Sequence, residues 1–419
     1  MENYSIVIFI MAVMIGLSSI AHKVKLPYPI LLIVAGIAIG FIPSIPEIEI
    51  NPEVIFLLFL PPLLYDAAFN ISFKEFRTHM NTISTLAISL VFLTASGIAV
   101  FAYYAIPGMT WPLAFVLGAI LSATDAVAAM SITKGLGLSH KTTTILEGES
   151  LINDASALIT YRFAVAAVTG SAFIFWKATL DFAILMAGGF LVGFVMGKIL
   201  AFILMRVHKD SLITISFMLL MPFITYLVAE EMNVSGVIAV VMQGLAISRF
   251  SRKIFPEILK KQSKTIWDII IFLLNGLIFI LIGLEFPYVL KSIHASQIPA
   301  YIAYAFLITV IALILRMFRV FWQKNTLQRA FQKNHKYVTE DTLLDVKNSL
   351  IISWSGMRGI VSLAVAIGLP KTLSNGDPFP LRSEIIFISV AVVLFTLIGQ
   401  GLTLPWLVKK LTGTFPQQE

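Results

Sequence analysis

The stretch IISWSGMRGIVSLAVAIG (residues 351–368) carries an arginine in the middle of an otherwise apolar run. Gly356 and Gly359 stand on either side of Arg358. A charged side chain at the centre of a bilayer is costly, and glycine weakens a helix. This stretch therefore predicts a membrane-spanning segment whose helix is interrupted around the arginine.

The composition around this stretch indicates a membrane protein with many spans. Hydrophobic residues make up 58% of the 419 positions, charged residues only 13%, and the mean hydropathy is +0.91. A soluble chain of this length needs more charge on its surface. The net charge of +7 is typical of cytoplasmic loops that collect Lys and Arg, so no nucleic-acid partner is expected. The chain has no cysteine, which excludes a disulfide framework and a thiolate nucleophile.

Apolar runs long enough to cross a bilayer as helices, about 20 residues each, divide the chain into candidate spans. We expect one transmembrane domain, residues 1–411, and a short cytoplasmic tail, 412–419. The first run has no basic residues before it and no small-residue cleavage pattern, so we expect a retained span and not a signal peptide. The thirteen candidate spans are approximately 5–21, 29–45, 53–69, 80–104, 111–134, 142–169, 176–206, 211–230, 235–250, 264–286, 298–322, 347–370 and 383–408.

The loops between these spans predict the orientation of the chain. Most of the 30 Lys and Arg residues lie in alternate loops, counted from the first loop. The loops on the other side of the membrane carry Glu47, Glu49, Glu230 and Glu231 and few basic residues. By the positive-inside rule, the N-terminus is outside and the C-terminus is cytoplasmic, which requires an odd number of spans. The thirteen spans agree with this requirement.

We select five ionisable side chains inside predicted spans, where such a group is a functional hypothesis by default. They are Asp66 in the third span, Asp125 in the fifth, Glu149 and Asp154 in the sixth, and Arg358 in the twelfth. Charges closer to the predicted span ends, such as Glu147, Arg162, Lys198 and Glu285, are expected to lie at the membrane interface.

The sixth span is the densest of these sites and reads EGESLINDASALIT (147–160). On a helix, Ser150 and Asp154 share one face, while Glu149 and Asn153 share another face about 100° away. One face can therefore present Ser150 and Asp154 to an ion path while Glu149 turns toward a neighbouring helix. The alternative is that these groups only form hydrogen bonds between helices. The desolvation cost of two carboxylates makes that alternative less favourable.

The fifth span, LGAILSATDAVAAMSITKG (117–135), places Asp125 beside Thr124 in a run of small residues. Small residues allow two helix backbones to approach closely. Thr and Asp side chains can form hydrogen bonds with the backbone groups that an interrupted helix leaves unpaired. A continuous, tightly packed helix with one buried Asp paired to a base is equally compatible with this pattern.

Interrupted segments at corresponding positions are typical of transporters built from inverted repeats. Residues of about 1–170 and 211–411 would form two such halves, with the span 176–206 as a linker helix, and the fifth span would then correspond to the twelfth. Because Arg358 is permanently charged, it must lie beside a carboxylate or exposed carbonyls. Glu149 is its expected partner, in a structural ion pair.

Four strings together resemble the NhaP/NHE branch of the sodium/proton antiporters, a family of monovalent cation:proton antiporters. They are FLPPLLYDA (59–67), SATDAVA (122–128), EGESLINDA (147–155) and WSGMRG (354–359). Their order and spacing match this branch over nearly the whole chain. The resemblance implies an all-α inverted-repeat antiporter fold with crossing interrupted helices. It also implies a homodimer in a lipid bilayer, and an elevator-like transport cycle.

The same resemblance implies roles for individual residues. Asp154 would be the main carrier of cation and proton. Asp125, Ser150 and Thr124, the last through its carbonyl, would be neighbouring ligands of Na+. Asp66 falls where prokaryotic relatives have an acidic residue near the site.

Three further residues would support the site in such a protein. Glu149 and Arg358 would form the buried ion pair of the family. Asn153 stands where electrogenic relatives have a second Asp, which implies electroneutral one-for-one exchange.

The expected activity is exchange of Na+, or Li+, for protons in a bacterial plasma membrane, in the service of pH homeostasis. Na+ prefers oxygen ligands. Desolvation of a carboxylate favours its neutralised form, so a proton and a cation can compete for Asp154. No cofactor is expected. Exchange of K+ for protons is the first alternative, because ligand types do not separate Na+ from K+.

Other classes of protein are less compatible with the residues. An intramembrane aspartyl protease could use Asp125 and Asp154 as a dyad that shares a proton, but the GxGD string that such enzymes carry is missing. A channel would show a repeated selectivity-filter loop, and none is found. Walker and HExxH motifs are also absent from the sequence. A transporter, and not an enzyme, is the expected class.

Overall fold

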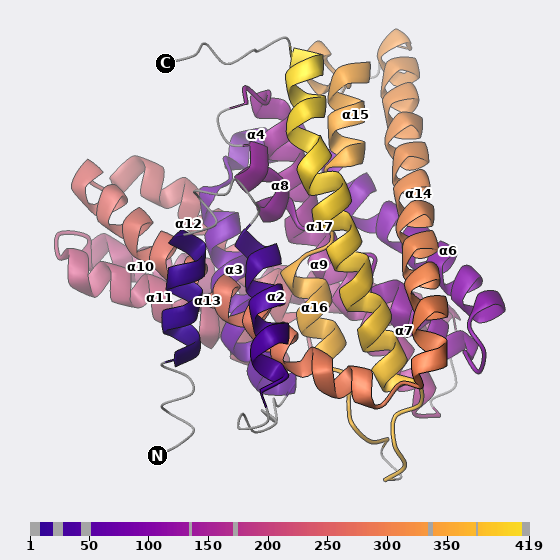
Figure 1. The fold of residues 1–419 in the computed structure, drawn as a ribbon. Coiled ribbons are helices and arrows are strands. Elements are labelled where there is room, and N and C mark those ends of the chain that lie inside the picture. Colours follow the sequence, from indigo (N-terminus) through magenta and orange to yellow (C-terminus); the bar gives the residue numbers. More distant parts are fainter. Residues whose placement is uncertain are drawn as a thin grey trace.

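The computed structural model describes residues 9–19, 28–42, 52–133, 136–170, 175–333, 338–373 and 376–412. In these ranges the chain is helical, apart from loops and one isolated β-bridge between Thr372 and Pro378 (Figure 1). The all-α class predicted from the sequence is confirmed. The predicted tail, 412–419, lies outside the described residues apart from Thr412.

A first helix, Phe9–Ser19, precedes the labelled elements. The labelled elements are α2 (Tyr28–Gly40), α3 (Pro52–Asn70), α4 (Phe73–Thr78), α5 (Met80–Ser84), η1 (Thr85–Ser89), α6 (Leu90–Ala105), α7 (Trp111–Ile120), α8 (Ala126–Thr133), α9 (His140–Val168), α10 (Phe175–Val207), α11 (Ser211–Glu231), α12 (Gly236–Ile254), α13 (Glu257–Lys291), η2 (Ala295–Gln297), α14 (Ile298–Gln332), η3 (Glu340–Thr342), α15 (Val346–Trp354), α16 (Ile360–Ile367) and α17 (Arg382–Thr412).

The described residues include helices that can cross a membrane by length and composition, because a helix satisfies all of its backbone groups internally. Every predicted span overlaps helical residues in the described part of the chain. The number of crossings stays a prediction. Seven helices of the described residues are long and apolar enough on their own: Met80–Ala105, His140–Val168, Trp176–Val207, Ser211–Glu231, Glu257–Lys291, Ala295–Gln332 and Arg382–Thr412.

The helices pack as two bundles. One, the scaffold bundle, contains α2, α3 and α10 to α13, with its most extensive contacts between α13 and α2 and between α10 and α12. The other, the crossing bundle, contains α4 to α9 and α14 to α17, with extensive contacts of α7 with α6 and α9 and of α14 with α17. In Figure 1, α10, α11 and α12 lie on the left, and α6, α7 and α14 lie on the right.

Glycines allow the close packing inside the scaffold bundle. A Cβ atom on Gly36 of α2 would collide with the backbone of Ile280 and Gly283 on α13. A Cβ atom on Gly193 of α10 would likewise collide with the backbone of Ala239 on α12. Small residues at such crossings let two helix backbones approach closely, which gives van der Waals contact where lipid provides no hydrophobic driving force.

Both predicted interruptions are confirmed. The fifth span divides into α7, which ends at Ile120, and α8, which begins at Ala126. The twelfth span divides into α15, which ends at Trp354, and α16, which begins at Ile360. The continuous helix that the sequence also allowed for the fifth span is therefore not formed. The correspondence of the two halves as inverted repeats stays a prediction.

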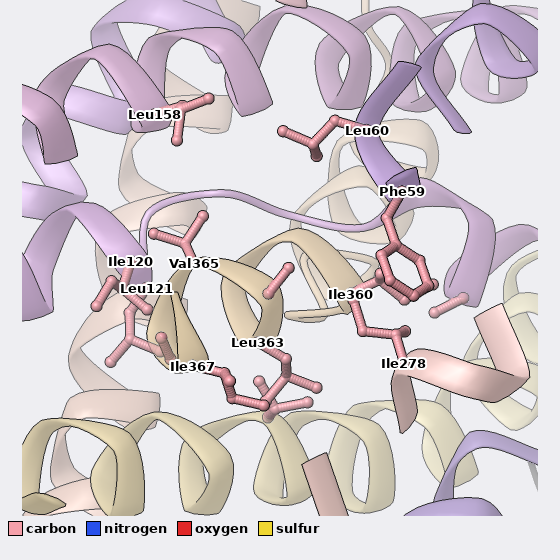
Figure 2. Close-up of a cluster of buried hydrophobic side chains, with 14 of the residues drawn as sticks. Phe59, Leu60, Ile120, Leu121, Leu158, Ile278, Ile360, Leu363, Val365 and Ile367 are labelled. Carbon is pink, nitrogen blue, oxygen red and sulfur yellow. The ribbon is translucent and has the colours of Figure 1, made fainter. Parts of the chain in front are cut away.

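Three large apolar side chains gather where the two bundles meet. Phe59 of α3, Ile278 of α13 and Ile360 of α16 lie close together in Figure 2 and are 2%, 2% and 7% exposed. They belong to one continuous hydrophobic cluster. We call these three residues the apolar seal.

Candidate cation-binding site

The two interrupted helices touch at their breaks. The backbone N–H of Asp125 donates a hydrogen bond of 2.8 Å to the carbonyl of Met357. A Cβ atom on Gly359 would overlap the carboxylate of Asp125. Glycine at this position is therefore what allows the Asp125 side chain to lie against the second break.

Arg358 stabilises the end of the first half-helix. Its Nη1 atom donates to the carbonyls of Ser122 and Ala123 at 2.8 and 2.9 Å. Its own backbone N–H donates to Thr396 Oγ1 at 3.1 Å. Both carbonyls lie in the break that follows α7, where no helical hydrogen bond satisfies them, so a guanidinium next to the negative end of the helix dipole is a suitable partner. Of the two partners allowed by the sequence, exposed carbonyls are the ones found.

Glu149 pairs with Arg316 of α14, so the predicted pair of Glu149 with Arg358 is wrong. Arg316 Nη2 donates to Glu149 Oε2 at 2.8 Å, and its Nη1 atom donates to Oε1. The two side chains are 3% and 1% exposed. A planar guanidinium binds both oxygens of a carboxylate at once, and α14 places Arg316 where it can do so.

Arg316 is a supporting residue that the sequence analysis did not select, because Arg316, Arg319 and Lys324 together are typical of the edge of a cytoplasmic loop. Its place inside the apolar run 298–322 is a signal that could have identified it, since a mid-span arginine needs a partner. Its Nε atom donates to the carbonyl of Ile352 at 3.0 Å. A Cβ atom on Gly356 would collide with the Arg316 side chain, so this glycine leaves room for the ion pair.

Thr124 is held against α9 by the polar residues of the sixth span. Asn153 Nδ2 donates to Thr124 Oγ1 at 2.7 Å, and Ser150 Oγ donates to the Thr124 carbonyl at 3.0 Å. Thr124 Oγ1 in turn donates to Glu149 Oε1 at 3.2 Å. The structure thus brings together four residues that the sequence selected, and Asn153 acts in it as a tie between α9 and the first break.

Asp154 and Asp125 lie in one cavity of about 910 Å³. Asp154 is buried, with 9% of its surface exposed, and lies within electrostatic range of Asp125. Asp125 Oδ1 accepts the backbone N–H of Ala128 at 3.2 Å, near the start of α8. Thr124 and Ser150 line the same cavity. Carboxylate, hydroxyl and carbonyl oxygens are the ligands that a hard cation prefers.

Asp66 lines the same cavity from α3 in the scaffold bundle. Its Oδ1 atom accepts a hydrogen bond of 3.1 Å from Asn70 Nδ2, and it lies within electrostatic range of Asp268 and Lys264. Asn153, Glu149 and Arg358 are not among the residues that line the cavity. The candidate residues thus divide into five that face the cavity and three that hold the breaks in place.

Comparison with known proteins identifies the family. The family described as "Sodium/hydrogen exchanger, transmembrane" matches residues 8–410. The chain is 34% identical to the sodium, potassium, lithium and rubidium/H(+) antiporter of Bacillus pumilus over 98% of this chain and 62% of that protein. This chain therefore spans less than two thirds of that relative. It is 30% identical to the Na(+)/H(+) antiporter NhaH of Halobacillus aidingensis over 97% of each protein.

A solved structure shows the same fold. The sodium proton antiporter MjNhaP1 from Methanocaldococcus jannaschii superimposes with a TM-score of 0.75 at 21% identity, covering 99% of this chain and 100% of that one. The apolar helices, the paired interruptions and the matched family over residues 8–410 lead to one conclusion. The chain is an integral, multi-pass membrane protein that belongs to the sodium/hydrogen exchanger family.

Proposed function

We propose that this protein exchanges Na+ for protons across a membrane, with Asp154 as the carrier of both. The observation that carries this proposal is the cavity lined by Asp154 and Asp125 together with Thr124 and Ser150, in which Asp154 is buried. The named relatives are antiporters, which are transporters and not enzymes.

Competition for one site is sufficient for exchange. A carboxylate away from bulk water is unstable as a bare anion, so Asp154 is occupied by a proton or by a cation. The Asp125 carboxylate would place a second negative charge near the bound cation, and Ser150 and Thr124 would provide neutral oxygen ligands. Asn153, an amide tied to Thr124, adds no titratable group beside Asp154. One proton would then replace one Na+ in each cycle, which makes the exchange electroneutral.

Ion-resolved exchange in proteoliposomes tests this function. We expect Na+ and Li+ to drive proton movement, read from an internal pH dye, and we expect the rate to be unaffected by an imposed membrane voltage. Choline chloride is the control for ionic strength. A response to K+ but not to Na+ would support the alternative of K+/H+ exchange. The name of the Bacillus pumilus relative, which includes potassium, is the reason to test this alternative. A voltage-dependent rate would contradict electroneutral exchange.

Movement of the crossing bundle against the scaffold bundle would provide alternating access. The cavity is lined at one end by Gly137, Leu138 and Lys264, which lie beside predicted cytoplasmic loops. Ile360 of the apolar seal also lines the cavity, and in this proposal the seal is the barrier toward the opposite side. A cavity with a polar opening on one side and apolar residues on the other supports an elevator-like cycle, in which the cavity opens alternately to the two sides.

An ion pair on the side away from the cavity entrance joins the two bundles. Arg162 Nη2, on α9, donates to both carboxylate oxygens of Glu230, on α11, at 3.0 Å each. Because the pair must break when α9 moves relative to α11, Arg162→Gln should favour opening on this side. The pair is partly exposed, so we expect an effect of about threefold on the population of the open state.

Thiol labelling can measure this opening, since the chain has no cysteine of its own. Leu158 lies one turn before Arg162 and is only 4% exposed. A Leu158→Cys substitution introduces a single thiol at this position. In intact cells, a membrane-impermeant maleimide should label Leu158→Cys faster when Arg162→Gln is also present. Lys260→Gln breaks the Lys260–Glu257 pair within α13 and is the control, with no change expected. Equal labelling rates with and without Arg162→Gln would refute the role of the pair.

The remaining expectations about the assembly are also proposals. The positive-inside distribution supports an external N-terminus and a cytoplasmic C-terminus. The bacterial relatives support a bacterial plasma membrane as the location and pH homeostasis as the purpose. A homodimer is the expected assembly.

A further inference from the structure

One face of α13 forms the scaffold wall of the ion cavity. The cavity is lined from this helix by Lys264, Asp268, Ile271 and Asn275. Their spacings of four, three and four residues place them on one face of the helix. The next residue on that face, Ile278, belongs to the apolar seal. Asn275 is therefore the polar residue of this wall that lies at the closed end of the cavity.

Two residues that line the cavity have a buried side-chain oxygen without a hydrogen-bond partner in the described part of the chain. The atoms are Asn275 Oδ1 and Ser362 Oγ, and each of the two residues is 2% exposed. Ser362 lies on α16, which packs against α13. Burial of an oxygen without a hydrogen bond is unfavourable, and an apolar residue would avoid this cost. Because both residues line one cavity, these unpaired oxygens point to a ligand that binds there.

We infer that Asn275 Oδ1 and Ser362 Oγ are contacts for the transported cation at the closed end of the cavity. Neutral oxygens can replace water ligands of Na+ as it moves onto the carboxylates. Ser362 lies three residues after Gly359, the position that meets the Asp125 carboxylate. The inference rests on the proposed Na+/H+ exchange and adds to it a ligand from the scaffold bundle. Because Asn275 does not move with the crossing bundle, this contact is lost when the site changes sides.

Asn275→Leu tests the inference, since it removes the amide and keeps a similar volume. The loss of one neutral ligand should raise the Na+ concentration for half-maximal exchange about tenfold. The dependence on proton concentration at saturating Na+ should not change, because the amide does not titrate. Binding of radioactive Na+ to purified protein in detergent should weaken by the same factor. Ser362→Ala is a milder second variant with the same direction expected.

Gln243→Leu is the matched control. Gln243 is a buried amide of the scaffold bundle whose Oε1 atom is also without a partner among the described residues, but it does not line the cavity. Unchanged Na+ affinity is expected for it. The inference is overturned if Asn275→Leu and Ser362→Ala both bind Na+ as the parent protein does, or if Gln243→Leu weakens binding equally. A parent protein that binds Na+ but does not exchange it would instead contradict the proposed function.

Discussion

Asp154→Asn should reduce Na+-driven proton movement in proteoliposomes to the background of empty vesicles. Asparagine has nearly the same shape, but it carries no charge for Na+ and cannot accept a proton near neutral pH. Both halves of the exchange therefore fail at once, in contrast to the loss of a neutral ligand. The fold should be retained, because a neutral amide at a buried position avoids the cost of a bare carboxylate.

Two measurements separate loss of transport from loss of folding in this variant. Size-exclusion chromatography and thermal unfolding in detergent should match the parent protein. Asp210→Asn is the control: Asp210 caps the start of α11 by accepting the N–H of Ile213, and asparagine caps helices equally well. Asp210→Asn should exchange Na+ at the parent rate. Exchange at the parent rate by Asp154→Asn would remove Asp154 from the carrier role.

Arg316→Met should destabilise the protein by about 3–5 kcal/mol, because it leaves the Glu149 carboxylate buried without its ion-pair partner. This is a large part of the total stability of a folded protein, which is commonly about 5–15 kcal/mol. We expect little folded protein from this single variant. The combined Glu149→Gln and Arg316→Met variant should recover most of the loss, since it removes both charges together.

A double-mutant cycle distinguishes the observed partner from the one expected from sequence. Glu149→Gln and Arg316→Met should show strong coupling in chemical denaturation of purified protein. Glu149→Gln and Arg358→Met should show weaker coupling, because Arg358 lies within electrostatic range of Glu149 but donates its hydrogen bonds to the carbonyls of Ser122 and Ala123. Stronger coupling of Glu149 with Arg358 than with Arg316 would contradict the structure.

Much of the fold and part of the site follow from local properties of the chain. A charge or a glycine inside an apolar run has a cost wherever it occurs, so Arg358 and its flanking glycines predicted an interrupted helix without any knowledge of its neighbours. Helical periodicity likewise placed Ser150 and Asp154 on one face, and both line the cavity.

The choice of partners depended on the packing of the helices. The sequence alone determined that the stretch 351–368 is broken at Arg358 and that Glu149 needs a buried base. Only the tertiary structure decided that this base is Arg316 of α14, that Arg358 holds the end of α7, and that Asn275 reaches the ion cavity. The physical reason is that the cost of burying a charge is a property of the residue and its span. Which groups offset this cost depends on distances between helices far apart in the chain.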